Sequence, residues 1–167
     1  EWEREAGMEV RLGEKASFGK GEPLFDRLGA AVDVGTTTLA AQLYAKEGLL
    51  AQAGVENPQK AYGADVISRG ERSLAGEGQE LTSAVCGGIG ELLRELADRA
   101  GVLPEQIDTL VITGNTSMLY LLTGRSPECL SHAPFQADWL AGEWIKADVL
   151  GLPCPNARVY FPPCISA

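Results

Sequence analysis

The sequence has little basic charge, no long apolar run and only one histidine, and these shortages exclude several classes of function. Its 167 residues hold 14 lysines and arginines against 23 aspartates and glutamates, a net charge of −9. Such an acidic surface repels nucleic acid and anionic lipid, so we expect neither as a partner. No stretch approaches the run of about 18 apolar residues that a membrane span requires. The charged N-terminus also lacks a signal-peptide core, so we expect a cytoplasmic protein.

The cysteine spacing excludes the common metal motifs. The four cysteines are Cys86, Cys129, Cys154 and Cys164. No two of them form a Cys-x-x-Cys motif, and their spacings fit neither zinc nor iron–sulfur patterns. Free thiols in a reducing compartment are the simpler interpretation. The single histidine, His132, stands beside Pro134 in a predicted loop and is a poor candidate for a ligand or a base.

Composition predicts one globular domain after a polar lead-in. Apolar residues make up 45% and charged residues 22%, which suffices for a core. Residues 1–28 are polar and glycine-rich, so we expect a linker or the end of an upstream domain. Within them Val10 and Leu12 alternate with charged neighbours, as a short edge strand would. The chain begins at Glu1 rather than at Met, as a fragment does.

From residue 29 onward, the pattern of apolar residues predicts a mixed α/β fold. Alternation and turn residues indicate an antiparallel meander, and three- and four-residue spacings indicate helices that alternate with further strands. Glycines Gly87, Gly88 and Gly90 in the long helix are interpreted as close packing on the sheet. The predicted strands are 29–34, 37–45, 49–55, 109–113 and 158–161, and the predicted helices are 64–74, 79–100 and 116–123. We expect residues 125–157 to be irregular.

The sharpest local signal is the hexapeptide D-V-G-T-T-T that begins at Asp33, between the first two predicted strands. Gly35 lets backbone N–H groups approach an anion closely, and the hydroxyls of Thr36, Thr37 and Thr38 add donors for phosphate oxygens. Asp33 would stand beside that anion, where Mg²⁺ held through its waters fits a carboxylate. An ordinary hairpin turn is the alternative.

A second signal is Gly114-Asn115-Thr116, which follows the predicted strand 109–113. The carboxyl ends of strands in α/β sheets face ligand crevices, so Asn115 and Thr116 are candidates to meet a terminal phosphate or an attacking water. The alternative is an N-cap for the next helix. Both roles are compatible.

A third segment, residues 57–69, reads N-P-Q-K-A-Y-G-A-D-V-I-S-R. Its residue types assign no chemistry by themselves. Asp65 and Arg69 stand four apart on a predicted helix, so an i,i+4 ion pair is the simplest interpretation.

Together these segments resemble the ATP-binding domain of the reductive activators of corrinoid proteins, within the actin/sugar-kinase/Hsp70 superfamily. The resemblance spans residues 29–167. It implies a ribonuclease-H-like lobe of the actin-like ATPase fold, a mixed sheet with helices on both faces, with the second lobe absent. It rests, in order, on the hexapeptide at Asp33, residues 57–69, G-N-T-S-M-L-Y-L-L-T-G at 114–124, Pro134-Phe135, and V-Y-F-P-P-C-I-S at 159–166.

The resemblance also implies a function for the intact parent protein. The parent would use ATP and Mg²⁺ to return the cobalt of a corrinoid protein from Co(II) to Co(I), with a [2Fe–2S] cluster in an upstream domain. It is a candidate homodimer, and ATPase activity is expected of the parent rather than of this lobe alone. Asp33 and Asn115 would be catalytic and Asp33 would hold Mg²⁺ through water. The nucleotide would be bound by Gly35, Thr36, Thr37, Thr38, Gly114 and Thr116.

The segment 57–69 would line the cleft or a partner surface through Asn57, Gln59, Tyr62, Asp65 and Arg69. One departure from the family pattern is Tyr120, which stands where a histidine is frequent. Other interpretations are a different enzyme of the superfamily, such as a small-molecule kinase with Asp65 as its base or a dehydratase/reductase activator. A third interpretation of the chain is a non-catalytic binding module.

Overall fold

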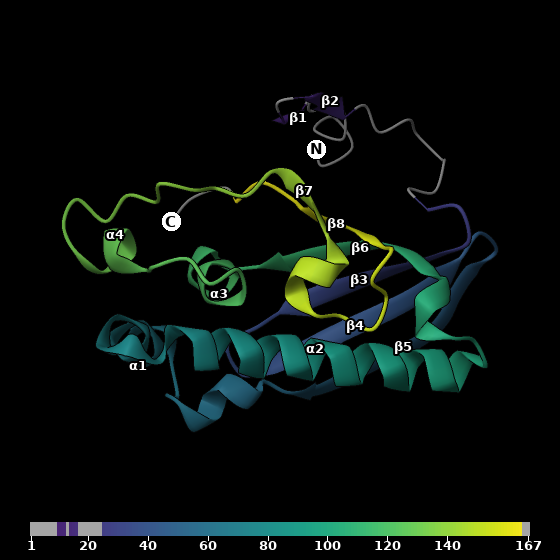
Figure 1. Ribbon diagram of the computed structural model, residues 1–167, viewed down its shortest axis with the longest axis horizontal. Coiled ribbons are helices and arrows are strands. Elements are labelled where there is room, and N and C mark those ends of the chain that lie inside the picture. Colours follow the sequence, from purple (N-terminus) through teal and green to yellow (C-terminus); the bar gives the residue numbers. More distant parts are fainter. Residues whose placement is uncertain (1–9, 13, 17–24, 165–167) are drawn as a thin grey trace, which may run out of the picture.

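A mixed six-stranded sheet is the centre of the computed structural model, which describes residues 10–12, 14–16 and 25–164 (Figure 1). The strand order is β5-β4-β3-β6-β8-β7. Strands β3, β6 and β8 are parallel, β4 runs antiparallel to β3 and β5, and β7 runs antiparallel to β8. The bounds are β3 (Leu28–Val34), β4 (Thr38–Ala45), β5 (Gly48–Glu56), β6 (Ile107–Gly114), β7 (Glu143–Lys146) and β8 (Arg158–Phe161).

The first three strands confirm the predicted meander. Along β3 and β4, alternate residues are buried, and residues such as Val32 and Leu43 face the core. The alternation at Val10 and Leu12 has a different outcome. Strand β1 (Val10–Leu12) pairs with β2 (Glu14–Ala16) in a separate two-stranded sheet and is not an edge of the main one.

The helices follow the predicted order with one added kink. Helix α1 (Val66–Arg72) continues through a π-helical turn, η3 (Ser73–Glu77), into α2 (Gly78–Ala100), and Gly76 kinks the chain at φ 107°. Residues 75–78, which separate the predicted helices 64–74 and 79–100, are therefore helical as well. The remaining helical elements are η2 (Pro58–Ala61), η4 (Pro104–Gln106), α3 (Thr116–Leu122), α4 (Glu128–Ser131) and η5 (Ala147–Leu150).

Helix α2 packs along the sheet with an apolar stripe, and one of its glycines fits the prediction of close packing best. A Cβ on Gly88 would stand 2.9 Å from Leu39 Cδ1 and 3.0 Å from the Pro58 ring. Gly90 is also buried, whereas Gly87 is exposed and a Cβ there would meet nothing within 4 Å. The buried stripe comprises Leu81, Val85, Ile89, Leu92, Leu93 and Leu96.

The described helices gather on one face of the sheet, where the resemblance implied helices on both. Residues of α2, α3 and η5 join one core with the inward residues of β3, β4, β6 and β8. The connections β5–α2–β6 and β6–α3–β8 advance across the sheet in the same direction. Because such parallel connections are nearly always right-handed, their helices fall on the same face. The opposite face exposes small side chains such as Ala31 and Ala40.

The segment 125–157, predicted to be irregular, contains α4, β7 and η5. Trp139 packs against the core, with its ring centroid 6.1 Å from that of Phe161. Trp144 lies on β7 and stacks on Tyr160 at 4.9 Å. The four cysteines form no disulfide with one another, and burial raises the pKa of the Cys86 thiol to about 11. None of the described helices is long and apolar enough to cross a bilayer.

Candidate functional site

Two of the predicted loops start at neighbouring positions of the sheet. Strands β3 and β6 are parallel neighbours, with Asp33 opposite Thr113 and Val34 opposite Gly114. The turn after β3 and the turn after β6 therefore leave the same edge side by side. This is the arrangement that strand carboxyl ends offer to ligands in α/β sheets.

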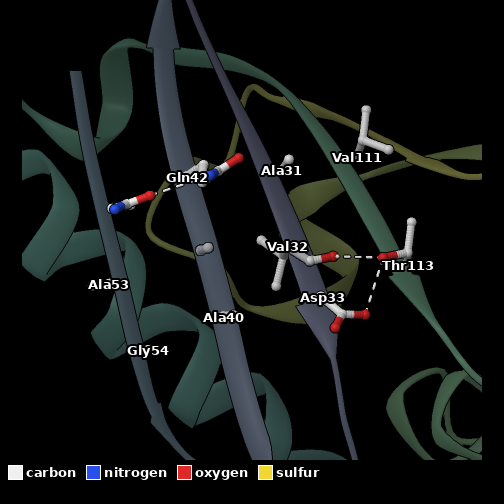
Figure 2. Close-up of a pocket in the computed structure, with 11 residues that line it drawn as sticks. Ala31, Val32, Asp33, Ala40, Gln42, Ala53, Gly54, Val111 and Thr113 are labelled. Carbon is white, nitrogen blue, oxygen red and sulfur yellow. Dashed lines mark hydrogen bonds between the residues drawn. The ribbon is translucent and has the colours of Figure 1, made fainter. Parts of the chain in front are cut away.

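Asp33 presents its carboxylate on the open face of the sheet, at this edge (Figure 2). Thr113 Oγ1 donates to Asp33 Oδ1 at 3.2 Å and also lies 3.4 Å from the carbonyl oxygen of Val32. Sequence reasoning missed Thr113. The available signal was the period-two alternation along β6. Because Ile112 faces the core, its neighbour Thr113 must point to the other face of the sheet, which is the face that carries Asp33.

The turn after β3 is tight and requires glycine. The N–H of Gly35 donates to the carbonyl oxygen of Thr38 at 3.0 Å, and a Cβ on Gly35 would stand 2.7 Å from that same oxygen. Thr37 and Thr38 are exposed and Thr36 is half-buried. The residues after β3 therefore form a hairpin turn, and Thr37 and Thr38 lie accessible at the edge of the sheet.

Asn57 and Gln59 support this turn from inside the protein. Asn57 Nδ2 donates to the carbonyl oxygen of Gly35 at 2.8 Å, and its N–H donates to that of Thr37 at 2.8 Å. Gln59 Nε2 donates to the carbonyl oxygen of Leu81 on α2 at 3.0 Å. Both side chains are fully buried, so they do not form the cleft or partner surface expected of them.

Arg69 is also fully buried, and it makes no ion pair with Asp65 within the described residues. Instead, Asp65 Oδ1 accepts from the N–H of Ser68 at 2.8 Å and caps α1. That hydrogen bond lowers the pKa of the exposed Asp65 carboxyl. Of the five residues expected at a cleft or partner surface, Tyr62 (half-buried) and Asp65 (exposed) remain accessible.

The turn after β6 leads directly into α3. Asn115 Oδ1 accepts from the N–H of Met118 at 2.9 Å, so the N-cap interpretation is confirmed, and the rest of Asn115 is exposed. Gly114 lies against β3, where a Cβ would stand 2.9 Å from the carbonyl oxygen of Val34. Thr116 is buried at the start of the helix.

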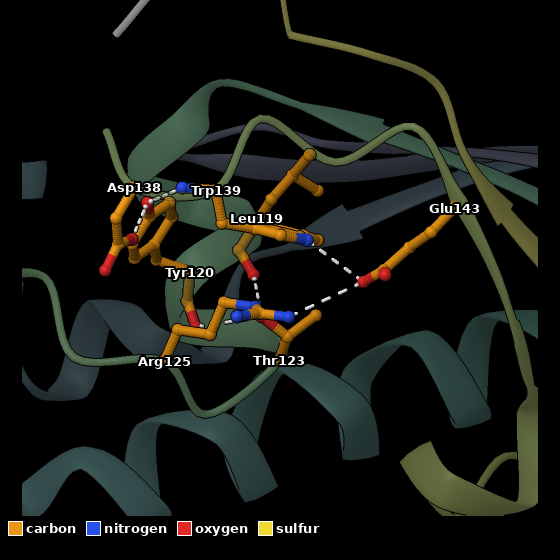
Figure 3. A network of polar contacts seen from close by, with 7 residues as sticks. All are labelled: Leu119, Tyr120, Thr123, Arg125, Asp138, Trp139 and Glu143. Atoms are coloured by element: carbon orange, nitrogen blue, oxygen red, sulfur yellow. Dashed lines mark hydrogen bonds and ion pairs between the residues drawn. The ribbon is translucent and has the colours of Figure 1, made fainter. Parts of the chain in front are cut away.

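A network of polar contacts holds the following segment onto α3 (Figure 3). The hydroxyl of buried Tyr120 donates to Asp138 Oδ1 at 2.5 Å and accepts from the N–H of Trp139 at 2.8 Å. Trp139 Nε1 donates to Glu143 Oε1 at 3.0 Å, and the Arg125 guanidinium lies 4.3 Å from the Trp139 ring centroid. Tyr120, the residue that departs from the family pattern, therefore holds residues 138–143 against α3.

An open hollow of about 540 Å³ begins at Asp33 and Thr113 and extends over the uncovered face of the sheet. Its floor is made of small residues such as Ala31, Ala40 and Gly54. No three His, Cys, Asp or Glu side chains gather to hold a metal within the described part of the chain. A lone exposed carboxylate fits Mg²⁺, which keeps several waters and shares its ligands with phosphate.

A family model described as the RACo middle region matches residues 28–167. The chain belongs to this family. The corrinoid activation enzyme RamQ of Eubacterium limosum is 34% identical to this chain over 122 residues, which are 70% of this chain and 20% of RamQ.

A solved structure of a reductive activator for corrinoid, iron–sulfur protein has a similar fold. It aligns with a TM-score of 0.80 at 29% identity, over 91% of this chain and 24% of the other. The likeness confirms the expected α/β class and the lobe of an actin-like ATPase fold. This RACo middle region thus spans about a fifth to a quarter of the length of these two relatives.

Proposed function

We propose that this RACo middle region is the first lobe of the ATP-binding domain of a cytoplasmic reductive activator, and that it supplies the Mg²⁺- and phosphate-binding loops. The observation that carries the proposal is the adjacency of two turns. Asp33 with Gly35–Thr38, and Gly114 with Asn115 and Thr116, leave neighbouring parallel strands at one edge. A nucleotide at that edge would meet both turns.

Each turn has a separate role in this proposal. The Gly35 turn and its threonine hydroxyls would bind phosphate oxygens, and Asp33 would hold Mg²⁺ through water. The metal would neutralise charge on the phosphates. Thr113 orients the Asp33 carboxylate through its hydrogen bond. Asn115, which is exposed, would approach the terminal phosphate from the start of α3, whereas the predicted contact from Thr116 is disfavoured by its burial.

The names of the two relatives support the choice of partner. One is a corrinoid activation enzyme and the other a reductive activator for a corrinoid, iron–sulfur protein. We therefore propose that the intact protein uses ATP to return the cobalt of a corrinoid protein from Co(II) to Co(I). A [2Fe–2S] cluster in another domain would supply the electron. The kinase alternative is weaker, because Asp65, its candidate base, is engaged as the cap of α1.

The test is calorimetric titration of Mg–ATP into the full-length protein. Wild type is expected to bind, and Asp33→Ala is expected to bind at least about tenfold more weakly, because the lost carboxylate leaves Mg²⁺ without its protein partner. Asp98→Ala on the exposed side of α2 is the matched control and should leave affinity unchanged. Equal affinity of wild type and Asp33→Ala would mean that Asp33 only ends a strand.

A further inference from the structure

Arg69 is the largest fully buried side chain of the described residues, and it carries a charge. Its Nε donates to the carbonyl oxygen of Gly63 at 2.8 Å and its Nη1 donates to Met118 Sδ at 3.6 Å. No carboxylate of the described residues lies within ion-pair distance of it. Burial lowers the pKa of Arg69, and the charge of Asp65 offsets only part of that effect from beyond ion-pair distance. Burying a cation without a close partner is costly, which points to a role beyond stability.

The contact with Met118 places Arg69 behind one of the two candidate phosphate turns. Met118 lies in the first turn of α3, and its N–H is the group that Asn115 Oδ1 accepts from at 2.9 Å. The guanidinium therefore supports the same first turn from which Asn115 would face a ligand. Gly63 joins this support, because its carbonyl oxygen holds the Arg69 side chain in place.

The other end of the same segment supports the other turn. Asn57 donates to the carbonyl oxygens of Gly35, through Nδ2, and of Thr37, through its N–H. Gln59 ties this end to α2 through the carbonyl oxygen of Leu81. One continuous segment, residues 57–69, thus contacts both turns from the protein interior. Three of its polar side chains are buried there: Asn57, Gln59 and Arg69.

We propose that residues 57–69 brace the two turns against each other, with Asn57 positioning the Gly35 turn and Arg69 positioning the start of α3. The proposal rests on the nucleotide site proposed above. Neither residue touches the ligand, since both act through a neighbour, Gly35 or Met118. The brace accounts for a buried arginine and a buried asparagine in a segment whose sequence assigns no chemistry.

The two ends of the brace predict different kinetic effects in the full-length protein. Arg69→Met should lower kcat for Mg–ATP hydrolysis by about tenfold or more, because Asn115 loses its orientation toward the terminal phosphate. The Kd for ADP, which lacks that phosphate, should stay within about twofold of wild type. Asn57→Ala should instead raise the Kd values for ADP and ATP together, by about tenfold.

Two further variants keep this test decisive. Arg72→Met is the matched control, since Arg72 lies on the same helix, is exposed and pairs with Glu77 at 2.7 Å. It should leave kcat and KM unchanged. Arg69→Lys keeps the cation but cannot reach both Gly63 and Met118 with a single ammonium group, so its kcat should lie between those of wild type and Arg69→Met. It also serves if Arg69→Met does not fold.

Each outcome supports or overturns the brace. An Arg69 variant with unchanged kcat, or one that loses ADP affinity as strongly as kcat, assigns Arg69 a merely structural role and overturns the proposal. If Asp33→Ala weakens binding of Mg–ATP while the Arg69 variants hydrolyse normally, the proposed function stands and the brace alone fails. A wild-type protein that binds no Mg–ATP overturns both.

Discussion

Replacing Tyr120 by alanine is expected to lower the free energy of unfolding of the 167-residue chain by about 3–5 kcal/mol. Tyr120 is fully buried on α3, with its ring edge-on to Trp139 at 5.7 Å. Truncation leaves a cavity under residues 138–143 and removes the hydroxyl to which that segment is tied. Urea denaturation followed by tryptophan fluorescence measures the loss, since Trp139 reports on this site.

Tyr120→Phe separates the hydroxyl from the ring. It keeps the packing but leaves the N–H of Trp139 without its acceptor, so a loss of about 1–3 kcal/mol is expected. Asp138 is exposed and still accepts from the Cys129 thiol at 3.6 Å. Tyr62→Phe is the control, because the Tyr62 hydroxyl has no hydrogen-bond partner among the described residues, and it should be neutral. A Tyr120→Phe variant as stable as wild type would mean that packing of the ring, and not the hydrogen bonds of the hydroxyl, stabilises this part of the fold.

The same network predicts a dependence of stability on acid pH. The hydrogen bond from the Tyr120 hydroxyl is the main cause of the lowered pKa of the Asp138 carboxyl. A carboxyl with a lowered folded-state pKa stabilises the fold above its unfolded value of about 3.9, and this contribution is lost as the pH falls through the folded value. Tyr120→Phe should therefore lose less stability than wild type between about pH 4 and pH 2. Parallel denaturation curves across that range measure the difference.

The elements that the sequence predicted are those whose signals are local. Alternation along β3 and β4, the three- and four-residue spacing of α2, and Asn115 as the cap of α3 each lie within one element and its neighbours. Strand β7 has no such signal. Its first three residues are half-buried and Lys146 is exposed, so burial does not alternate. Its place is fixed by pairing with β8, which only the folded chain supplies.

The candidate site likewise has parts that local sequence signals predicted and parts that depend on long-range contacts. The hexapeptide at Asp33 and the turn at Gly114 carry recognisable residue types, so both were predicted from the sequence. What brings them together is the parallel register of β3 with β6, which pairs residues as far apart in the sequence as Asp33 and Thr113. The burial of Asn57 and Arg69 was not predictable either, because polar residues in a loop and on a short helix are expected at the surface.

The register at this edge leaves no room for a side chain at Gly114. A Cβ there would stand 2.9 Å from the carbonyl oxygen of Val34 and 3.3 Å from its Cβ. Gly114 is not at a positive φ, so alanine is compatible with the backbone and the cost is steric. Because the colliding atom belongs to the neighbouring strand, the ends of β3 and β6 must part to accept a methyl group.

Gly114→Ala is therefore expected to lower the free energy of unfolding by about 1–3 kcal/mol. Gly87→Ala is the matched control, since a Cβ there meets nothing within 4 Å on the exposed side of α2, and it should raise stability by about 1 kcal/mol. In the full-length protein, parting the strand ends moves the two turns away from each other, so Gly114→Ala should also weaken Mg–ATP binding by about tenfold. Calorimetry on both variants measures this. A Gly114→Ala protein that binds Mg–ATP as wild type does would contradict the proposal that nucleotide binding depends on the close approach of these two turns.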